Sequence, residues 1–316
     1  MHFAGDSIVL PEHFLEHQKG RALRRKAIDR WFGRLGLILT LGTLGVLAIL
    51  LLNLAANGLF RIDWHFLTSF PSRRAAEAGV LSAWVGTALL MLVTASLAIP
   101  LGVAAGIYLE EYAPKNKWTD FVEINIANLA GVPSILYGLM ALGLFVYKFR
   151  FGQSILAGGM ALGCLVLPIV IVSTREALRT IPAMIREAAF ALGATRWQAV
   201  WHHLLPYSTG GIATGVILSM SRAIGESSPL ITIGALTFIA FLPPPALLDH
   251  APYVSFEWVF SPFTALPIQM FNWVSRPGEE FQANAAAAGL LLMVITLGMN
   301  GAAILLRRHA QRNIKW

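Results

Sequence analysis

Residues 81–109 read LSAWVGTALLMLVTASLAIPLGVAAGIYL, a run without a single charged side chain. As a helix with a rise of about 1.5 Å per residue, this run is longer than the roughly 30 Å of hydrocarbon in a bilayer. Backbone N–H and C=O groups find no water in lipid, so they must bond within the segment, as a helix allows. The run therefore predicts a membrane-spanning helix and sets the class of the whole fold.

Five further apolar runs of similar character occur along the chain, at 35–57, 124–147, 154–173, 209–241 and 283–306. Together the six runs predict an all-α integral membrane protein with six transmembrane helices. The composition agrees: 56% of residues are apolar and 13% are charged, about half the charge of a soluble domain. The lone cysteine, Cys164, excludes a disulfide framework or a Cys-rich metal site.

The positive charges indicate the orientation of these helices. The net charge is +7, but no basic stripe with interleaved aromatic residues indicates nucleic-acid binding. Seventeen of the 24 Lys and Arg residues fall in the tail before residue 35, in the connections 110–123 and 174–207, and after residue 306, whereas the alternate connections hold six. Since Lys and Arg gather in cytoplasmic loops, both termini are expected in the cytoplasm.

The expected organisation is a basic cytoplasmic tail (1–34), a six-helix transmembrane domain (35–307) and a short cytoplasmic C-terminal tail (308–316). The connection 242–282 is long, rich in proline and aromatic residues, and extracytoplasmic in this topology. It is interpreted either as a loop resting on the outer membrane surface or as a docking surface for an extracytoplasmic partner.

The cytoplasmic connection reads TREALRTIPAMIREAAFALGATRWQAVWHHLLPY over residues 174–207. Apolar and small residues at helical spacing predict a helix that Gly193 ends. A second helix from Thr195 to Leu204 is expected to end at Leu205-Pro206. Periodicity leaves two interpretations open, a helix pair on the lipid surface and a helix pair that fits a groove of a soluble partner.

A charged pair lies inside the fifth apolar run, where the sequence reads LSMSRAIGESSPLITIGA from residue 218. Arg222 and Glu226 are spaced i,i+4 and share one helix face. Each costs roughly 2.5–3.5 kcal/mol at the bilayer centre, so this face should avoid lipid. The pair could lock helices together as an ion pair, or Arg222 could offer its fork of donors to an oxyanion. Ser227 and Ser228, followed by Pro229, add hydroxyls and a helix break.

The segment EAAFALGATRWQAVWHHLLP (187–206) resembles the EAA loop of ABC-importer permeases. The resemblance implies the MetI-like permease bundle and a coupling helix that docks on a separate ATPase. The docking positions would be Glu187, Ala188, Ala189, Gly193, His203, Leu205 and Pro206, although His203 stands where the family has an aliphatic residue. No Gly-x-x-x-x-Gly-Lys-Ser/Thr loop occurs in the chain, so ATP and Mg²⁺ would be bound by the partner.

The segment SRAIGESSPLITIGALTF (221–238) resembles the permeases of the phosphate-specific (Pst) ABC importer, in particular the PstA-like half, as does GVPSILYGL (131–139). This chain has Ser227-Ser228 where that family usually has Thr-Ala. The resemblance covers roughly residues 65–310. It implies a phosphate path at Arg222, Glu226, Ser227 and Ser228 in a bacterial plasma membrane. The implied partners are two copies of the ATPase, a second, PstC-like permease and an extracytoplasmic phosphate-binding protein.

Other interpretations stay open at this point. The coupling loop is shared by permeases for phosphonate, sulfate and molybdate. A secondary transporter could carry an intramembrane Arg–Glu pair without an EAA loop, and a membrane scaffold or sensor could use the pair structurally. The pattern HFLEH (13–17) matches a zinc-peptidase signature, but it lies in a polar tail without a companion ligand region, so no metal site is expected.

Overall fold

The computed structural model describes residues 12–246, 253 and 255–311, and all regular structure within these ranges is helical. The side chains of residues 12–24, which include the HFLEH pattern, lie outside the described part. The chain divides into two units, residues 1–53 and 54–316. The α-helices are α1 (Glu12–Gly58), α2 (Trp64–Thr68), α3 (Leu81–Ile107), α4 (Lys117–Leu129), α5 (Ser134–Ala141), α6 (Ile155–Arg179), α7 (Ala183–Ala191), α8 (Arg196–Ala199), α9 (Leu205–Gly225), α10 (Ser228–Ile233), α11 (Leu266–Val274) and α12 (Glu279–Gln311).

Shorter helical segments join several of these elements. Three are wider π-helical turns, η3 (Tyr108–Tyr112), η4 (Leu142–Lys148) and η5 (Val200–Leu204), and three are 3₁₀ turns, η1 (Leu59–Arg61), η2 (Ala75–Glu77) and η6 (Glu257–Phe260).

The first unit consists of most of α1. This helix runs through Arg34 without interruption, so the expected boundary between a tail and a span is not a break in the backbone. The stretch Ile28–Arg61 of α1 and η1 is long and apolar enough to cross a membrane.

Three segments of the second unit meet the same criterion, Leu81–Tyr112, Ile155–Arg179 and Glu279–Leu305, and the pair Lys117–Leu129 and Ser134–Lys148 meets it if counted as one bent span. The described residues thus hold four such segments, or five with the bent pair, and the expected count of six is not confirmed. Two of the six apolar runs are interrupted. The run 124–147 is bent by 103° between α4 and α5. The run 209–241 is divided between α9 and α10.

The first break follows from Pro133, which lacks an N–H group and disfavours helical backbone at the residue before it. The carbonyl of Leu129, at the end of α4, finds no N–H group on residue 133. It accepts hydrogen bonds from Val132 N at 3.1 Å and from the Tyr137 hydroxyl at 2.8 Å. The chain thus changes direction completely at Pro133.

The second break lies after Gly225, where Glu226 has extended backbone (φ −80°, ψ 117°). Pro229 then lies in the first turn of α10, where its missing N–H is tolerated. Gly234 ends α10 with a φ of +99°, a conformation that favours glycine. The helix interruption expected around residues 227–229 is confirmed.

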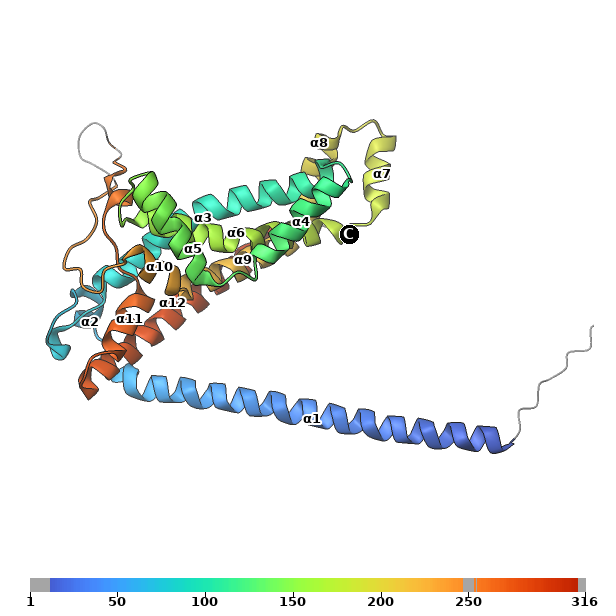
Figure 1. The fold of residues 1–316 in the computed structure, drawn as a ribbon, viewed down its shortest axis with the longest axis horizontal. Coiled ribbons are helices and arrows are strands. Elements are labelled where there is room, and N and C mark those ends of the chain that lie inside the picture. The colour runs from blue at the N-terminus through green and yellow to red at the C-terminus, as the bar shows by residue number, and fades with distance from the viewer. Residues whose placement is uncertain (1–11, 247–252, 254, 312–316) are drawn as a thin grey trace, which may run out of the picture. The chain divides into compact units, whose positions relative to one another are not determined.

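The centre of the second unit is the contact between α3 and α6, which lie side by side (Figure 1). Small residues allow this close approach: a Cβ atom on Gly159 would lie 2.5 Å from Val93 Cγ1, and one on Gly102 would lie 2.6 Å from Val170 Cγ1. Because lipid does not drive apolar helices together, such close backbone contacts are what stabilises a membrane bundle.

The segment 242–282 is more than a surface loop. It contains α11, whose Leu266, Ile268 and Trp273 are buried. Trp273 packs with Phe66 and with alanines of α12 in one apolar cluster. Residues 247–252 and 254 of this segment lie outside the described part.

Candidate functional site

The first candidate site is the helix break after α9. Arg222 lies in the last turn of α9, and its Nε is 3.4 Å from Glu226 Oε1. The structure thus brings together the two residues that the sequence placed on one face. The Arg222 side chain is 40% exposed and that of Glu226 21%. Among the described residues, no acceptor is hydrogen-bonded to the Nη atoms of Arg222, so most of its fork of donors is open to another acceptor.

Ser227 caps the start of α10, Ser228 is its first residue, and both are half-buried. Their carbonyls accept hydrogen bonds inside α10, from Ile231 N and from Thr232 Oγ1. Both serines therefore lie within one to two residues of Glu226, whose extended backbone separates α9 from α10. A broken helix in a membrane protein is tolerated where it is buried in protein or lines a cavity.

The two helix breaks of the second unit lie close together. Val132, in the first break, packs in the same apolar cluster as Ala223 and Ile224 near the end of α9. Gly138 of α5 lies against α10, and a Cβ atom there would be 2.7 Å from Pro229 Cα. The irregular backbone of both segments is therefore concentrated in one region of the bundle.

The second candidate site is the segment 182–206. After α7, Gly193 has a φ of +83°, Ala194 N donates to Ala189 O, and Gly193 N donates to Phe190 O. This is the Schellman arrangement that ends a helix at glycine, and the end predicted at Gly193 is confirmed. Thr195 and Gln198 then form a reciprocal cap that starts α8.

The expected end of the second helix at Leu205-Pro206 is wrong. Residues 196–225 are one uninterrupted helix made of α8, η5 and α9. A proline inside an α-helix would clash with the carbonyl four residues earlier. The wider π turn η5, directly before Leu205 and Pro206, accommodates the proline ring and lets the helix continue.

The residues predicted to dock on an ATPase differ in exposure. Glu187, Ala188, Gly193 and His203 are exposed, Leu205 and Pro206 are half-buried, and Ala189 is buried. Large apolar side chains are exposed beside them: Met184 at 75%, Leu192 at 91% and Trp197 at 62%. Trp201 stacks on Trp197 with ring centroids 5.4 Å apart. Such a group of exposed apolar side chains marks an interaction surface.

A network of ion pairs lies behind this surface, and the sequence did not single it out. Glu111 is bonded by Arg186, with Nη2–Oε1 at 2.7 Å. The neighbouring Glu110 is 2.8 Å from Arg179 Nε and 3.5 Å from Arg175 Nε. Arg175 Nη2 is also 2.5 Å from Glu123 Oε1, in α4. The available signal was the pair of acidic residues directly after the apolar run 81–109.

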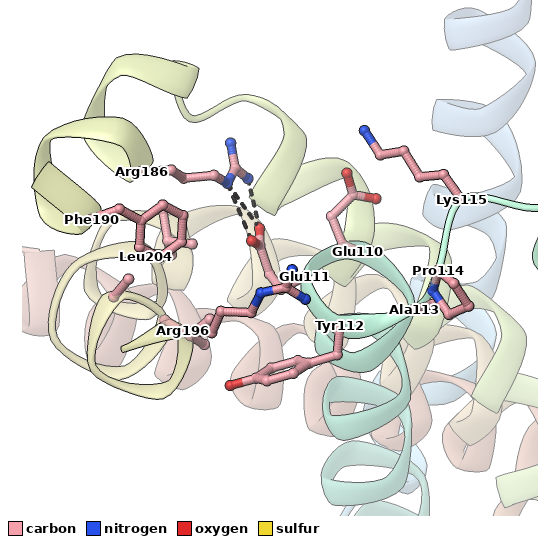
Figure 2. Close-up of a pocket in the computed structure, with 12 residues that line it drawn as sticks. Glu110, Glu111, Tyr112, Ala113, Pro114, Lys115, Arg186, Phe190, Arg196 and Leu204 are labelled. Carbon is pink, nitrogen blue, oxygen red and sulfur yellow. Dashed lines mark hydrogen bonds and ion pairs between the residues drawn. The ribbon is translucent and has the colours of Figure 1, made fainter. Parts of the chain in front are cut away.

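Figure 2 shows Glu110, Glu111 and Arg186 of this network around a pocket of about 470 Å³ between the end of α3 and the segment α7–α8–η5. Acidic and basic side chains lie close together in the lining of this pocket. Its lining residues are Glu110, Glu111, Tyr112, Ala113, Pro114, Lys115, Arg186, Phe190, Arg196, Ala199, Val200 and Leu204.

Comparison with known proteins identifies the family of this chain. Residues 98–312 match the family described as "Binding-protein-dependent transport system inner membrane component". The chain belongs to this family. It is therefore a membrane permease component, and its helical bundle is the one that the EAA resemblance implied.

Curated relatives extend over most of this permease. It is 30% identical to the "Probable ABC transporter permease protein YqgI" of Bacillus subtilis, over 88% of this chain and 95% of the relative. It is 32% identical to the "Phosphate transport system permease protein PstA" of Xylella fastidiosa (strain Temecula1), over 81% of this chain and 84% of the relative.

A solved structure supports the fold. The permease resembles a chain of an inward-facing conformation of the MetNI methionine ABC transporter, with a TM-score of 0.57 and 17% sequence identity, over 72% of this chain and 93% of that chain. At this identity the likeness concerns the MetI-like fold alone.

Proposed function

We propose that this chain is a permease subunit of an ATP-driven importer for inorganic phosphate. The observation that carries the substrate is the 30–33% identity to several permeases named PstA, over about three quarters or more of the chain. The working complex contains a second, PstC-like permease, two copies of a separate ATPase that binds ATP and Mg²⁺, and an extracytoplasmic phosphate-binding protein. It lies in a bacterial plasma membrane.

The proposed topology has six spans: α1, α3, the bent segment 117–148, α6, the broken segment 205–233, and α12. Both termini and the segment 182–206 then lie in the cytoplasm. The ion pairs support this topology, because they join the connection 110–123 to the connection 174–207, and both connections were expected on the cytoplasmic side from their positive charge.

Phosphate passes the break after α9 in this proposal. Arg222 supplies planar donors that suit an oxyanion, and Glu226 orients the guanidinium through its 3.4 Å contact. The hydroxyls of Ser227 and Ser228 add donors beside them. A guanidinium facing lipid is costly, so the exposed face of Arg222 borders the path shared with the second permease.

ATP binding and hydrolysis on the partner switch the path between inward-open and outward-open forms. The segment 182–206 transmits the switch, with Glu187, Ala188 and Gly193 on its exposed side. The chain itself performs no ATP chemistry in this scheme.

The decisive experiment is ATP hydrolysis and uptake by the isolated complex in lipid vesicles. Phosphate presented by its binding protein should stimulate hydrolysis and enter the vesicles, whereas sulfate, molybdate and phosphonate should not. Stimulation by another oxyanion would reassign the substrate. Uptake that continues without ATP but stops when the proton gradient is collapsed would indicate a secondary transporter.

A further inference from the structure

The short helix α7 is weakly packed against the rest of the permease. Of its nine residues, Ala189 is the one that is buried. Ile185 reaches the edge of the apolar cluster formed by Leu178, Ile181, Val200 and Leu204. The 470 Å³ pocket lies on one side of α7. Close packing of apolar side chains is therefore a minor part of what positions this helix.

The guanidinium of Arg186 connects α7 to its neighbours by hydrogen bonds. Arg186 donates from Nη2 and Nε to Glu111, at 2.7 Å and at 3.1 Å to the same Oε1. It also donates from Nη2 to Leu178 O and from Nη1 to Ile181 O, both at 3.1 Å. We name the Arg186–Glu111 pair the clamp. It connects α7 to η3 at the end of α3, and to the backbone at the end of α6.

The clamp is sheltered and its partners are themselves fixed. The side chains of Glu111 and Arg186 are 11% and 22% exposed, so salt screens their attraction less than it screens a surface pair. Next to Glu111, Glu110 forms ion pairs with Arg179 and Arg175, and Arg175 forms a further ion pair with Glu123 of α4. The end of α3 is thus tied to α6 and α4, and a displacement of α7 acts on this group as a whole.

We propose that the clamp is the positioning contact that couples α7 to the membrane helices. When the docked ATPase moves α7, Arg186 pulls the ends of α3 and α6 with it, and the phosphate path changes its opening. This role rests on the proposed function. It requires the fork of arginine, because one group must bond both a carboxylate and two backbone carbonyls.

The test uses the full complex in vesicles, with E111Q, which keeps the side-chain size, and R186Q, which removes the guanidinium. Each should keep the ATPase bound and hydrolysing ATP, while phosphate uptake per ATP falls about tenfold, as expected for a lost coupling contact. R186K should be impaired as well. The charge swap E111R/R186E restores an ion pair but leaves Leu178 O and Ile181 O without the Arg186 donors, so it should recover only part of the coupling. R74Q, which removes an exposed pair with Glu77 at 3.0 Å, is the matched control and should transport normally.

A second readout does not depend on the substrate. Spin labels at Leu192, after α7, and Trp118, in α4, are placed on exposed positions in a C164A background. The distance between the labels should be narrowly distributed in the wild type and broadened in R186Q. An unchanged distribution, or unchanged uptake per ATP in R186Q and E111Q, would overturn the clamp. Broadening in a complex that imports no phosphate would instead support the clamp and contradict the proposed substrate.

Discussion

At the scale of single residues, Arg222 carries the substrate hypothesis. R222A should abolish phosphate uptake while the complex still assembles, because no other described guanidinium lies at the break. R222K should recover part of the uptake at most, since an ammonium keeps the charge but loses the planar fork. Uptake of labelled phosphate by vesicles measures both.

The matched control for Arg222 is R74A, which removes an exposed arginine whose pair with Glu77 lies outside the break. It should leave uptake unchanged. Normal transport by R222A would contradict the substrate role, and loss of the folded protein in R222A would show that the pair with Glu226 is structural.

At the scale of an element, the end of α7 depends on the left-handed backbone of Gly193. A Cβ atom there would meet no neighbour within 4 Å, so G193A tests conformation alone. Alanine at this φ costs roughly 1–2 kcal/mol, and amide exchange of Ala194 should therefore accelerate about tenfold.

The matched variant for Gly193 is G193N, because asparagine tolerates the left-handed region better than alanine. Amide exchange of Ala194 should accelerate less in G193N than in G193A, and G193N should retain more binding to the ATPase than G193A. Equal exchange in G193A and the wild type would contradict the Schellman arrangement as the element's end.

At the scale of the whole molecule, the bundle depends on the close contact of α3 and α6. G159A would place a methyl group 2.5 Å from Val93 Cγ1, whereas G163A would meet Leu97 Cβ at an ordinary 4.0 Å. Both glycines lie in α6, so the gain in helix propensity is shared. G159A should lower the free energy of unfolding by about 1–3 kcal/mol and therefore unfold at a lower temperature in detergent. G163A should unfold at the temperature of the wild type.

The sequence predicts those parts of this molecule that depend on local chemistry. The apolar run 81–109 became α3, Gly193 ends α7, and the interruption before Pro229 lies where the residue types indicate. The 103° bend at Pro133 could not be predicted in size or direction, because proline removes a hydrogen bond but neighbouring helices decide the direction that follows.

The ion pairs behind α7 could not be predicted, since Glu111 and Arg186 are 75 positions apart in sequence. A single sequence carries no information on which distant charges meet. The helix end expected at Pro206 is wrong for a related reason. Proline usually ends a helix, and the wider turn η5 that lets this helix continue depends on the surrounding packing.

The uninterrupted helix 196–225 has a mechanical consequence. It carries the exposed Trp197 near one end and Arg222 near the other, and at 1.5 Å per residue it is about 45 Å long. Because the helical backbone is continuous between the two ends, a displacement of one end is transmitted to the other. A rigid tilt of about 5° around the Trp197 end would displace the Arg222 end by about 4 Å, more than the width of a water molecule.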